Sequence, residues 1–428
     1  MTDRVTPYDV AIVGAGYVGL PLTTTFAEAG CRVLVVDVVP TIVEGLNRGE
    51  SHIEDVESAR LAPLVQQDLV HATTDYAELK DADAILIALP TPLSRQREPD
   101  LTIVESAAQQ ISRVLREGQV VVLESTTWPG TTREILQPAL EEGSGLKVGE
   151  GFFLAMSPER VDPGREDWTT KTTPKVLGGI TPACTKRAAE IYRRAVDTVV
   201  EVSTPEAAEL TKLLENIFRS VNIALVNELA QMCERMGIDV WEVIEAAATK
   251  PFGFMSFQPG PGLGGHCIPI DPFYLTWKAR EFGFYTGFIE LAGKVNESMP
   301  YFCRSVVSQA LNHERQRSLK GSKILVLGVA YKPGISDTRE SPAIKLIGLL
   351  ENAGAEVSYH DPHVPSFTEN GISMSSVALE PAAYDCVVVV TDHAEIDYDR
   401  LVDESVLVVD LRNATGANGK RSDKVWKL

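Results

Sequence analysis

Short apolar runs alternate with helical patterns in the first part of the chain. The run at 9–13 ends at Gly14, a helical pattern follows over 21–29, and a β-branched run at 32–36 is closed by Asp37. Further apolar runs of strand type lie at 84–89, 120–124 and 152–156. Strands that alternate with helices predict a doubly wound, mostly parallel α/β sheet, which is a Rossmann-like domain.

A long helix is predicted to begin after Ser203. The stretch Ser-Thr-Pro-Glu at this position offers a hydroxyl cap, followed by a proline and an acidic residue for the first turn. After that proline, neither proline nor glycine occurs until Gly237, so the helix would be roughly 45–50 Å long at about 1.5 Å per residue. We expect it to form a spine between two domains and to offer a surface for dimerisation.

The end of the chain repeats the order seen at its start. Residues 351–365 align with 27–40, with a helix end, a glycine, a strand and an aspartate at the same spacing. A strand and glycine at 323–332 precede this second copy, and 386–393 parallels 85–92. Either all such units look alike or the chain carries an internal duplication. Both alternatives lead to a second, degenerate Rossmann-like domain.

The expected fold class is therefore α/β, with two Rossmann-like doubly wound domains joined by a long central helix in an all-α middle region. A chain of 428 residues exceeds the size at which one core keeps growing, which also favours several domains. The predicted domains are an N-terminal Rossmann-like domain at 1–202, a central helical domain with a cysteine loop at 203–312, and a C-terminal Rossmann-like domain at 313–428.

Charge and composition exclude several classes of protein. The chain has 40 Lys and Arg against 59 Asp and Glu, and its net charge of -19 disfavours nucleic acid and anionic membranes as partners. No apolar run reaches about 18 residues, and the first residues lead us to expect no leader peptide. The six cysteines are scattered without a CxxC pair. We expect a cytoplasmic protein with reduced thiols and without a metal site.

The turn Gly14-Ala-Gly16-Tyr-Val-Gly19 lies between a predicted strand and a predicted helix, and Asp37 closes the next strand. Such glycines allow a tight turn that brings a pyrophosphate to the helix N-terminus, and the carboxylate accepts hydrogen bonds from the adenosine ribose. A carboxylate would repel a 2′-phosphate, so NAD is favoured over NADP. The alternative is a purely structural turn. The residues expected at the cofactor are Gly14, Gly16, Tyr17, Val18, Gly19, Asp37, Thr91 and Glu124.

The corresponding turn of the second domain begins at Gly328 and lacks the later glycines, so a second dinucleotide site is not expected. Lys332 and Arg339 either hold the phosphates of a different nucleotide or are ordinary surface cations. Their spacing leaves both alternatives open.

Glycine and proline crowd around Cys267. The segment 259–272 contains four of each, a composition that is costly in any regular element, so its backbone must approach something closely. Backbone N–H groups of Gly264 and Gly265 would lower the pKa of the thiol and could hold an oxyanion, which predicts a nucleophile. The alternative is a buried structural thiol, which we expect for the other five cysteines.

Lys212 and Asn216 lie four residues apart on the predicted long helix and therefore share one face. Asn222 and Asn227 follow in an otherwise apolar stretch. These residues either face a cleft or are ordinary polar positions of a long helix.

Several further motifs follow one another in the chain. They are ESTTWPGTT at 124–132, SPERVDPG at 157–164, GGHCIPIDP at 264–272 and YKPGISDTRESP at 331–342. Together with the glycine turn and the helix of Lys212 and Asn216, they make the sequence similar to the UDP-sugar 6-dehydrogenase family, also called the UDP-glucose/UDP-mannuronate dehydrogenase family. The resemblance covers essentially the whole chain.

The resemblance implies a three-part architecture of an NAD domain, a central helix that builds a homodimer or higher homo-oligomer, and a UDP-binding C-terminal domain. It also implies site residues. The expected catalytic residues are Cys267 as nucleophile, Lys212 and Asn216 as oxyanion donors, and Asp271, Thr126 and Glu159 for water positioning or proton transfer. The expected substrate contacts are Lys332, Arg412, Gly264 and Arg339.

Two departures from the UDP-glucose branch affect these expectations. Pro163 stands where that branch has a second glutamate, which puts the role of that glutamate in doubt here. Ile270 stands where that branch usually has lysine, and His266 precedes the cysteine. This loop looks more like the branch that oxidises UDP-N-acetylhexosamines, particularly UDP-N-acetylglucosamine.

The implied reaction is a four-electron oxidation of the C6 primary alcohol of a UDP-sugar to the uronic acid, through a thiohemiacetal and a thioester on Cys267. It would consume two NAD⁺ and one water per sugar, without a metal, and serve polysaccharide biosynthesis. UDP-N-acetylglucosamine is the expected substrate, with UDP-glucose or dTDP-glucose as alternatives. Remoter alternatives are a single-step hydroxyacid dehydrogenase, which would release one NADH, and a catalytically silent NAD-binding protein.

Overall fold

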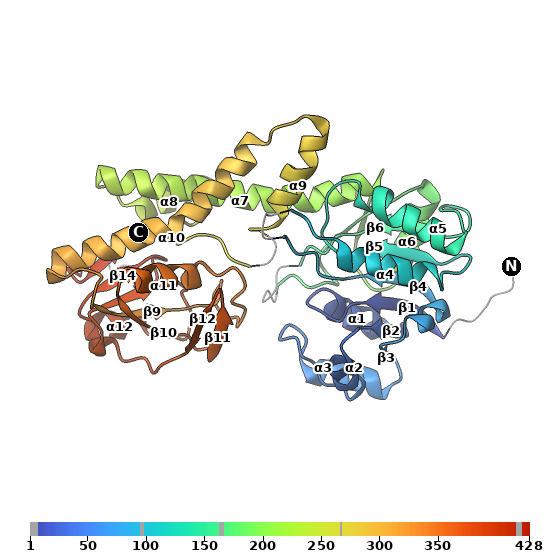
Figure 1. The fold of residues 1–428 in the computed structure, drawn as a ribbon, viewed down its shortest axis with the longest axis horizontal. Helices are drawn as coiled ribbons and strands as arrows, with labels where there is room; N and C mark the ends of the chain where they lie inside the picture. The colour runs from blue at the N-terminus through green and yellow to red at the C-terminus, as the bar shows by residue number, and fades with distance from the viewer. Residues whose placement is uncertain (1–6, 95–97, 162–166, 266–267, 417–421) are drawn as a thin grey trace. The chain divides into compact units, whose positions relative to one another are not determined.

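The structure is a computed structural model that describes residues 7–94, 98–161, 167–265, 268–416 and 422–428. The chain divides into two compact units, Met1–Glu215 with Phe273–Phe284 and Asn216–Pro272 with Tyr285–Leu428. Each unit contains its own mainly parallel sheet (Figure 1). No helix formed by the described residues has the length and hydropathy needed to span a membrane.

Eight strands of the described chain form the sheet of the first unit, in the order β3-β2-β1-β4-β5-β6-β7-β8. Neighbouring strands are parallel except β6 and β7. The strand order reverses at β1, as in a doubly wound sheet, and the predicted fold class is confirmed. The strands are β1 Tyr8–Val13, β2 Val33–Val36, β3 Val70–Thr73, β4 Ala82–Ile87, β5 Val120–Leu123, β6 Phe153–Met156, β7 Lys175–Gly179 and β8 Val199–Val202.

Helices cover both faces of this sheet. Alternate residues of β1 enter two separate cores: Val10 and Ile12 pack with α1, whereas Ala11 and Val13 pack with α4. All four side chains are fully buried, which explains why residues 10–13 are apolar without a polar alternation. The helices of this unit are α1 Gly19–Glu28, α2 Pro40–Asn47, α3 Ser58–Gln66, α4 Thr102–Ser112, α5 Gln137–Ser144, α6 Pro182–Tyr192 and α9 Asp271–Ala279. The first two residues of α9 belong to the second unit. Short helices of the first unit are η1 Tyr76–Asp81, η2 Thr132–Leu136 and η3 Arg280–Phe282.

The second unit contains a parallel sheet of the order β10-β9-β13-β14-β15 and a separate hairpin of β11 and β12. The strands are β9 Lys323–Leu327, β10 Glu356–His360, β11 Ser366–Glu369, β12 Ile372–Ser375, β13 Cys386–Val389, β14 Val408–Asp410 and β15 Val425–Lys427. The helices are α8 Val240–Ala248, α10 Gly287–Arg315, α11 Pro342–Asn352 and α12 Tyr398–Glu404, with the short helix η4 Pro381–Ala383. The predicted second Rossmann-like domain is therefore confirmed.

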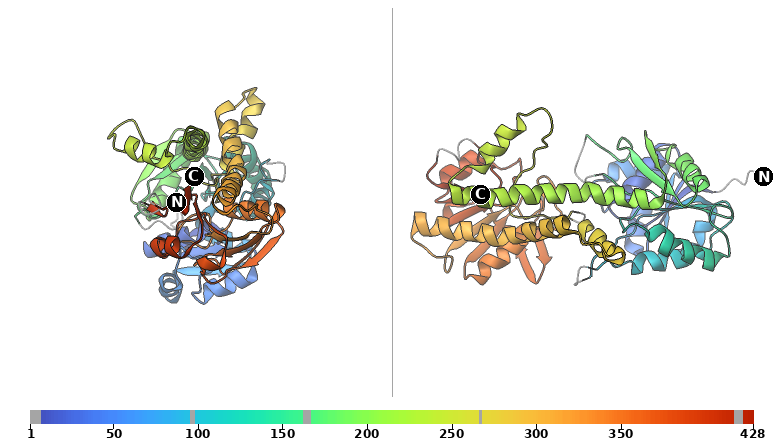
Figure 2. Two further views of the ribbon diagram at one scale, coloured as in Figure 1. Left: turned by 90° about the vertical axis from the view of Figure 1, so that its left-hand side faces the viewer. Right: turned by 90° about the horizontal axis from the view of Figure 1, so that it is seen from above.

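The predicted long helix is α7, Pro205–Met236, with 32 residues. Thr204 Oγ1 accepts a hydrogen bond from the N–H of Ala207 at 3.2 Å, as a hydroxyl cap does, and Gly237 follows the last turn with a left-handed φ of 67°. The boundary between the two units falls within this helix, after Glu215. In the second unit, α10 runs beside the later part of α7 (Figure 2).

The two sheets share one local detail. In each, the glycine that follows the first strand has a left-handed φ, 102° for Gly14 and 84° for Gly328. In each, the next residue donates its N–H to the aspartate after the second strand, at 2.9 Å to Asp37 and at 2.7 Å to Asp361. The aligned spacing in the sequence therefore corresponds to the same local geometry.

Candidate functional site

In the glycine turn after β1, packing requires glycine at two of the three positions and leaves free space at the third. A Cβ added to Gly14 would lie 2.5 Å from the carbonyl oxygen of Ala88, and one added to Gly19 would lie 1.8 Å from that of Gly14. A Cβ at Gly16 would have no neighbour within 4 Å among the atoms it could meet. The first and last glycines are thus needed for the turn itself, while Gly16 leaves space through which a pyrophosphate can approach α1.

Asp37 ties this turn to β2. Its Oδ2 accepts the N–H of Ala15 at 2.9 Å, and its Oδ1 accepts the N–H of Val39 at 3.0 Å. A carboxylate has about four acceptor positions, so capacity remains for ribose hydroxyls. Tyr17 is partly exposed, and Val18 is the N-cap residue of α1 without a side-chain cap. The turn, its carboxylate and an uncapped helix terminus together fit NAD.

The loops after β4 and β5 are joined by hydrogen bonds. Thr91 Oγ1 donates to the carbonyl of Thr126 at 2.8 Å, and the carbonyl of Thr91 accepts the hydroxyl of Tyr274 at 2.6 Å. Thr91 is buried and Thr126 is half-buried. Two predicted site residues that lie 35 positions apart are thus brought together at the carboxyl ends of adjacent strands.

Glu124 and Glu159 meet at a lysine that the sequence analysis did not identify. Lys175, at the start of β7, donates to Glu124 Oε2 at 2.6 Å and to Glu159 Oε2 at 3.1 Å. The hydroxyl of Tyr192 donates to the other oxygen of Glu124. Lys175 and Glu124 are buried, with side chains 3% and 0% exposed, and the side chain of Glu159 is 12% exposed. The predicted contact of Glu124 with the cofactor stays a prediction. A lysine opening an apolar strand was the available signal.

Burial and this lysine act differently on the two carboxyls. Burial raises the pKa of Glu124 to about 7, although Lys175 opposes the shift. Burial would also raise the pKa of Glu159, but Lys175 and the N–H groups of Arg160 and Val161 outweigh it and lower this pKa. Glu159 is therefore held as a carboxylate, the form that a base requires.

Glu209, a buried glutamate of the first unit, was not identified from the sequence either. Glu209 of α7 accepts the N–H of Gly130 at 2.6 Å, and the N–H and hydroxyl of Thr132 at 2.9 and 2.7 Å. Burial raises its pKa to about 7. These bonds hold the Trp-Pro-Gly turn of the motif at 124–132 against α7.

Asn216 is fully buried on α7, and its amide is engaged on both sides. Its Nδ2 donates to Asp271, and its Oδ1 accepts from Arg219. Asp271 is 2% exposed and begins α9, at the end of the cysteine segment. Lys212, one turn earlier on α7, is 6% exposed, and no ion pair joins it to another described residue. A buried ammonium of this kind is suited to bind a developing negative charge.

The expected close approach of the glycine-rich segment is confirmed. A Cβ on Gly260 would lie 2.7 Å from Arg412 Nη1, and one on Gly264 would lie 2.6 Å from Tyr331 Cβ. Gly265 has a φ of 85° and donates its N–H to the carbonyl of Arg339 at 2.9 Å. The segment therefore packs on Arg412 and on the motif at 331–342.

Asn227 fixes the start of the same segment, because its Oδ1 accepts the N–H of Gly260 at 2.9 Å. Its Nδ2 donates to Asn296 of α10 at 2.9 Å. The position is structural, whereas Asn222 donates to a backbone carbonyl of its own helix.

The predicted cations of the second unit already have acidic neighbours. Arg339 forms an ion pair with Asp337 at 2.6 Å, and Arg412 Nε lies 3.3 Å from Asp392. Lys332 is half-buried. An anionic phosphate would have to compete with Asp337 and Asp392 for these two arginines.

Cys267, His266 and Pro163 lie outside the described residues. The other five cysteines are buried and free, as predicted for structural thiols, and burial raises the pKa of Cys303 and Cys386. They are Cys31, Cys184, Cys233, Cys303 and Cys386.

A doubly wound sheet with this turn and carboxylate defines the class of NAD-dependent dehydrogenases. Family models agree. Residues 8–196 match the NAD binding domain, 206–298 the central domain and 325–417 the UDP binding domain of the UDP-glucose/GDP-mannose dehydrogenase family. The chain belongs to this family and is an NAD-dependent UDP-sugar dehydrogenase.

Relatives support the assignment over nearly the full length. A UDP-N-acetyl-D-glucosamine 6-dehydrogenase of Pseudomonas aeruginosa is 34% identical, covering 90% of each chain. An NDP-N-acetyl-D-galactosaminuronic acid dehydrogenase of Ralstonia solanacearum is 35% identical, covering 95% of this chain and 96% of the relative. The solved structure of a UDP-D-ManNAc dehydrogenase from Pyrococcus horikoshii has a TM-score of 0.87 at 33% identity, covering 95% and 96%.

Proposed function

We propose that the chain oxidises the C6 primary alcohol of a UDP-N-acetylhexosamine to the carboxylate, with UDP-N-acetylglucosamine as the preferred sugar. The observation that carries the proposal is the anchoring of the cysteine segment at both ends. Gly265 is bound to the carbonyl of Arg339, and Asp271 is bound to Asn216. Cys267 lies between these two anchors in the sequence.

Each side chain has a proposed part in the reaction. Two NAD⁺ molecules, bound one after the other at the Gly14 turn, would supply the hydride acceptors for the two oxidations, so the first NADH would leave before the second hydride is lost. Lys212 assists removal of the hydroxyl proton at C6. The thiolate of Cys267 adds to the aldehyde, and Lys212 and Asn216 hold the resulting oxyanion. The second hydride loss gives a thioester on Cys267.

Hydrolysis of the thioester requires a base or a water-positioning group. Glu159 is our first choice, because Lys175 keeps it ionised in a buried setting. Asp271 and Thr126 are the other candidates. Asp271 has an amide donor in Asn216, while Thr126 shares a hydrogen bond with Thr91.

The sugar preference rests on the relatives. Those above are named for N-acetylglucosamine, N-acetylgalactosaminuronic acid and ManNAc, all of them N-acetylated hexose derivatives. At 33–35% identity the relatives do not decide which N-acetylhexosamine epimer is the substrate. The preference for UDP-N-acetylglucosamine rests instead on the sequence of the cysteine loop. UDP-glucose and dTDP-glucose are the alternatives. The substrate contacts would include Lys332, Arg412, Gly264 and Arg339.

The test counts NADH at 340 nm with limiting UDP-N-acetylglucosamine, its galacto and manno epimers, UDP-glucose and dTDP-glucose. Two NADH per sugar support the double oxidation, and one would indicate the single-step alternative. Cys267→Ser should still bind the nucleotides but lose turnover. Wild-type turnover in this variant would remove the thiol from the mechanism.

We also propose a homodimer that uses α7. Several apolar side chains of this helix are exposed, among them Leu214 at 64%, Leu225 at 55% and Phe218 at 45%. Water-exposed apolar stripes of this kind typically mark protein interfaces. Light scattering of the native chain and of a Leu225→Lys variant tests this, since a monomeric wild type contradicts it.

A further inference from the structure

His393 connects a buried aspartate to a backbone loop in the second unit. The side chain is fully buried, and its Nε2 lies 3.1 Å from Asp361 Oδ2. The N–H of Gly334 donates to its Nδ1 at 3.2 Å. A ring nitrogen that accepts carries no proton, so in this arrangement Nδ1 is the acceptor and Nε2 donates to the carboxylate.

Asp361 is a fixed end of this chain of bonds. It accepts N–H groups from Val329 and Ala330, in the turn after β9, at 2.7 and 3.0 Å. It also accepts those of His363 and Val364. Burial would raise the pKa of Asp361, but His393 and these backbone donors lower it to about 2. The carboxylate cannot turn without losing several bonds.

Gly334 lies at the other end, in the loop 331–339. Tyr331 closes this loop by donating its N–H to the carbonyl of Asp337 at 3.0 Å. The loop receives the N–H of Gly265 and packs Tyr331 on the glycine-rich segment. It also carries Lys332 and Arg339, within the part of the chain that matches the family's UDP binding domain.

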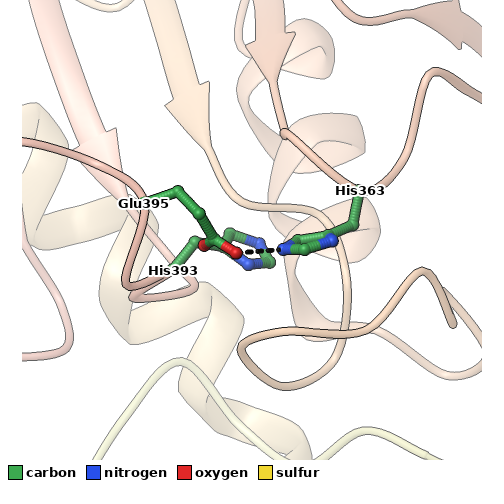
Figure 3. Close-up of side chains that lie close together, drawn as sticks. All are labelled: His363, His393 and Glu395. Carbon is green, nitrogen blue, oxygen red and sulfur yellow. Dashed lines mark hydrogen bonds and ion pairs between the residues drawn. The ribbon is translucent and has the colours of Figure 1, made fainter.

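The residue types nearby could also suggest a cation. Ligand atoms of His363, His393 and Glu395 lie within 4.8 Å of one another (Figure 3). His363 and Glu395 already pair at 3.1 Å, however, and both nitrogens of His393 have partners. A metal would have to replace one of these bonds, so the arrangement favours a hydrogen-bond network.

We propose that His393 is a positioning residue for nucleotide-sugar binding. It holds the loop 331–339 through Gly334, so that the loop presents its cations to a diphosphate and supports the glycine-rich segment. The inference rests on the proposed function. This positioning role differs from a purely structural one, because the loop is held by the hydrogen bond from Gly334 to Nδ1 and not by the burial of the ring.

Two polar variants separate these roles. In His393→Asn the side-chain oxygen can occupy the position of Nδ1 and accept from Gly334. In His393→Gln the amide reaches the position of Nε2 and donates to Asp361, but the acceptor at Nδ1 is missing. Both variants are neutral and polar, so a general loss of stability affects both. His363→Gln, on the half-exposed neighbouring ring, is the matched control.

The experiment measures binding of UDP alone by calorimetry and the KM and kcat of the UDP-sugar. NADH binding to the first unit serves as a folding control. We expect His393→Gln to weaken UDP about tenfold and raise KM similarly with kcat within about threefold, the size of one lost buried hydrogen bond. His393→Asn and His363→Gln should stay within about threefold of wild type.

Failure of the wild type to bind UDP would count against the proposed function itself. With wild-type binding intact, equal affinities in all three variants, or equal losses in the Asn and Gln variants, would overturn the role of His393. So would a stoichiometric metal in the purified wild type that His363→Gln loses.

Discussion

Removing the ammonium of Lys175 tests the charge balance inside the first unit. In Lys175→Met the aliphatic stem is kept, but the carboxyls of Glu124 and Glu159 lose a partner at 2.6 and 3.1 Å. The side chains of Lys175 and Glu124 are 3% and 0% exposed, so water cannot replace the lysine. Removing one partner of a buried ion pair lowers the free energy of unfolding by about 3–5 kcal/mol.

The loss should depend on pH in a defined direction. In the wild type, Lys175 lowers the pKa of Glu159 in the folded chain. This shift stabilises the fold at pH values above the usual carboxyl range, and the stabilisation is lost as the pH falls through the pKa of the folded state. In the variant, burial alone would raise this pKa. Stability would then be present at low pH and lost as the pH rises. We therefore expect the loss in unfolding free energy to be largest at pH 8 and smaller by at least about 1 kcal/mol at pH 5.5.

Urea unfolding at these two pH values, followed by circular dichroism, measures the effect. Lys171→Met is the matched control, because Lys171 is exposed in the same segment and should change stability by less than about 0.5 kcal/mol. Adding Glu124→Gln to Lys175→Met should recover part of the loss, since one unpaired carboxyl is removed. A loss that is equal at both pH values, or no larger than that of Lys171→Met, would refute the reasoning.

Three further predictions concern the glycine turn, Glu209 and Asn227. Gly14→Ala should cost more than about 2 kcal/mol of stability, because Gly14 has a left-handed φ and a Cβ there would meet the carbonyl of Ala88. Gly16→Ala should leave the melting temperature unchanged and weaken NADH binding in a fluorescence titration. The reverse pattern would contradict the roles given to these two glycines. Glu209→Gln should destabilise the fold, and urea titrations should give a loss that is about 2 kcal/mol smaller at pH 7 than at pH 5. The reason is that the raised pKa of the wild-type carboxyl makes the stability contributed by Glu209 fade as the pH rises across that range. A loss that is the same at both pH values would contradict the raised pKa of Glu209. Asn227→Leu should cost about 2 kcal/mol by leaving the N–H of Gly260 unpaired, with a raised KM for the UDP-sugar; an unchanged KM would show that the glycine-rich segment is held by other contacts.

The strand predictions succeeded where long apolar runs met a glycine and an aspartate, as in the run at 9–13 that became β1. In the first unit they missed β3, β7 and β8, which are short and contain His71, Lys175 and Glu201 respectively. Short runs that also contain a polar residue do not stand out from the apolar faces of neighbouring helices. Pairing with an adjacent strand, which is a long-range contact, makes these segments extended.

The candidate site divides in the same way. The positions of Gly14 and Asp37 could be predicted because a left-handed φ and a strand end leave a local pattern. Lys175 and His393 could not be predicted, because their roles come from partners 16 to 59 positions away. Asn216 was identified as a polar residue on a helix face, but its bond to Asp271 is a tertiary contact.

The sequence by itself determined the two sheets, the length of α7, the dinucleotide turn and the family, since each depends on spacing along the chain. Only the tertiary structure decided which buried charges face one another and which backbone segments are clamped together. The physical reason is that a carboxylate or imidazole acquires its chemical character from burial and from its hydrogen-bond partners, and both are properties of the folded chain.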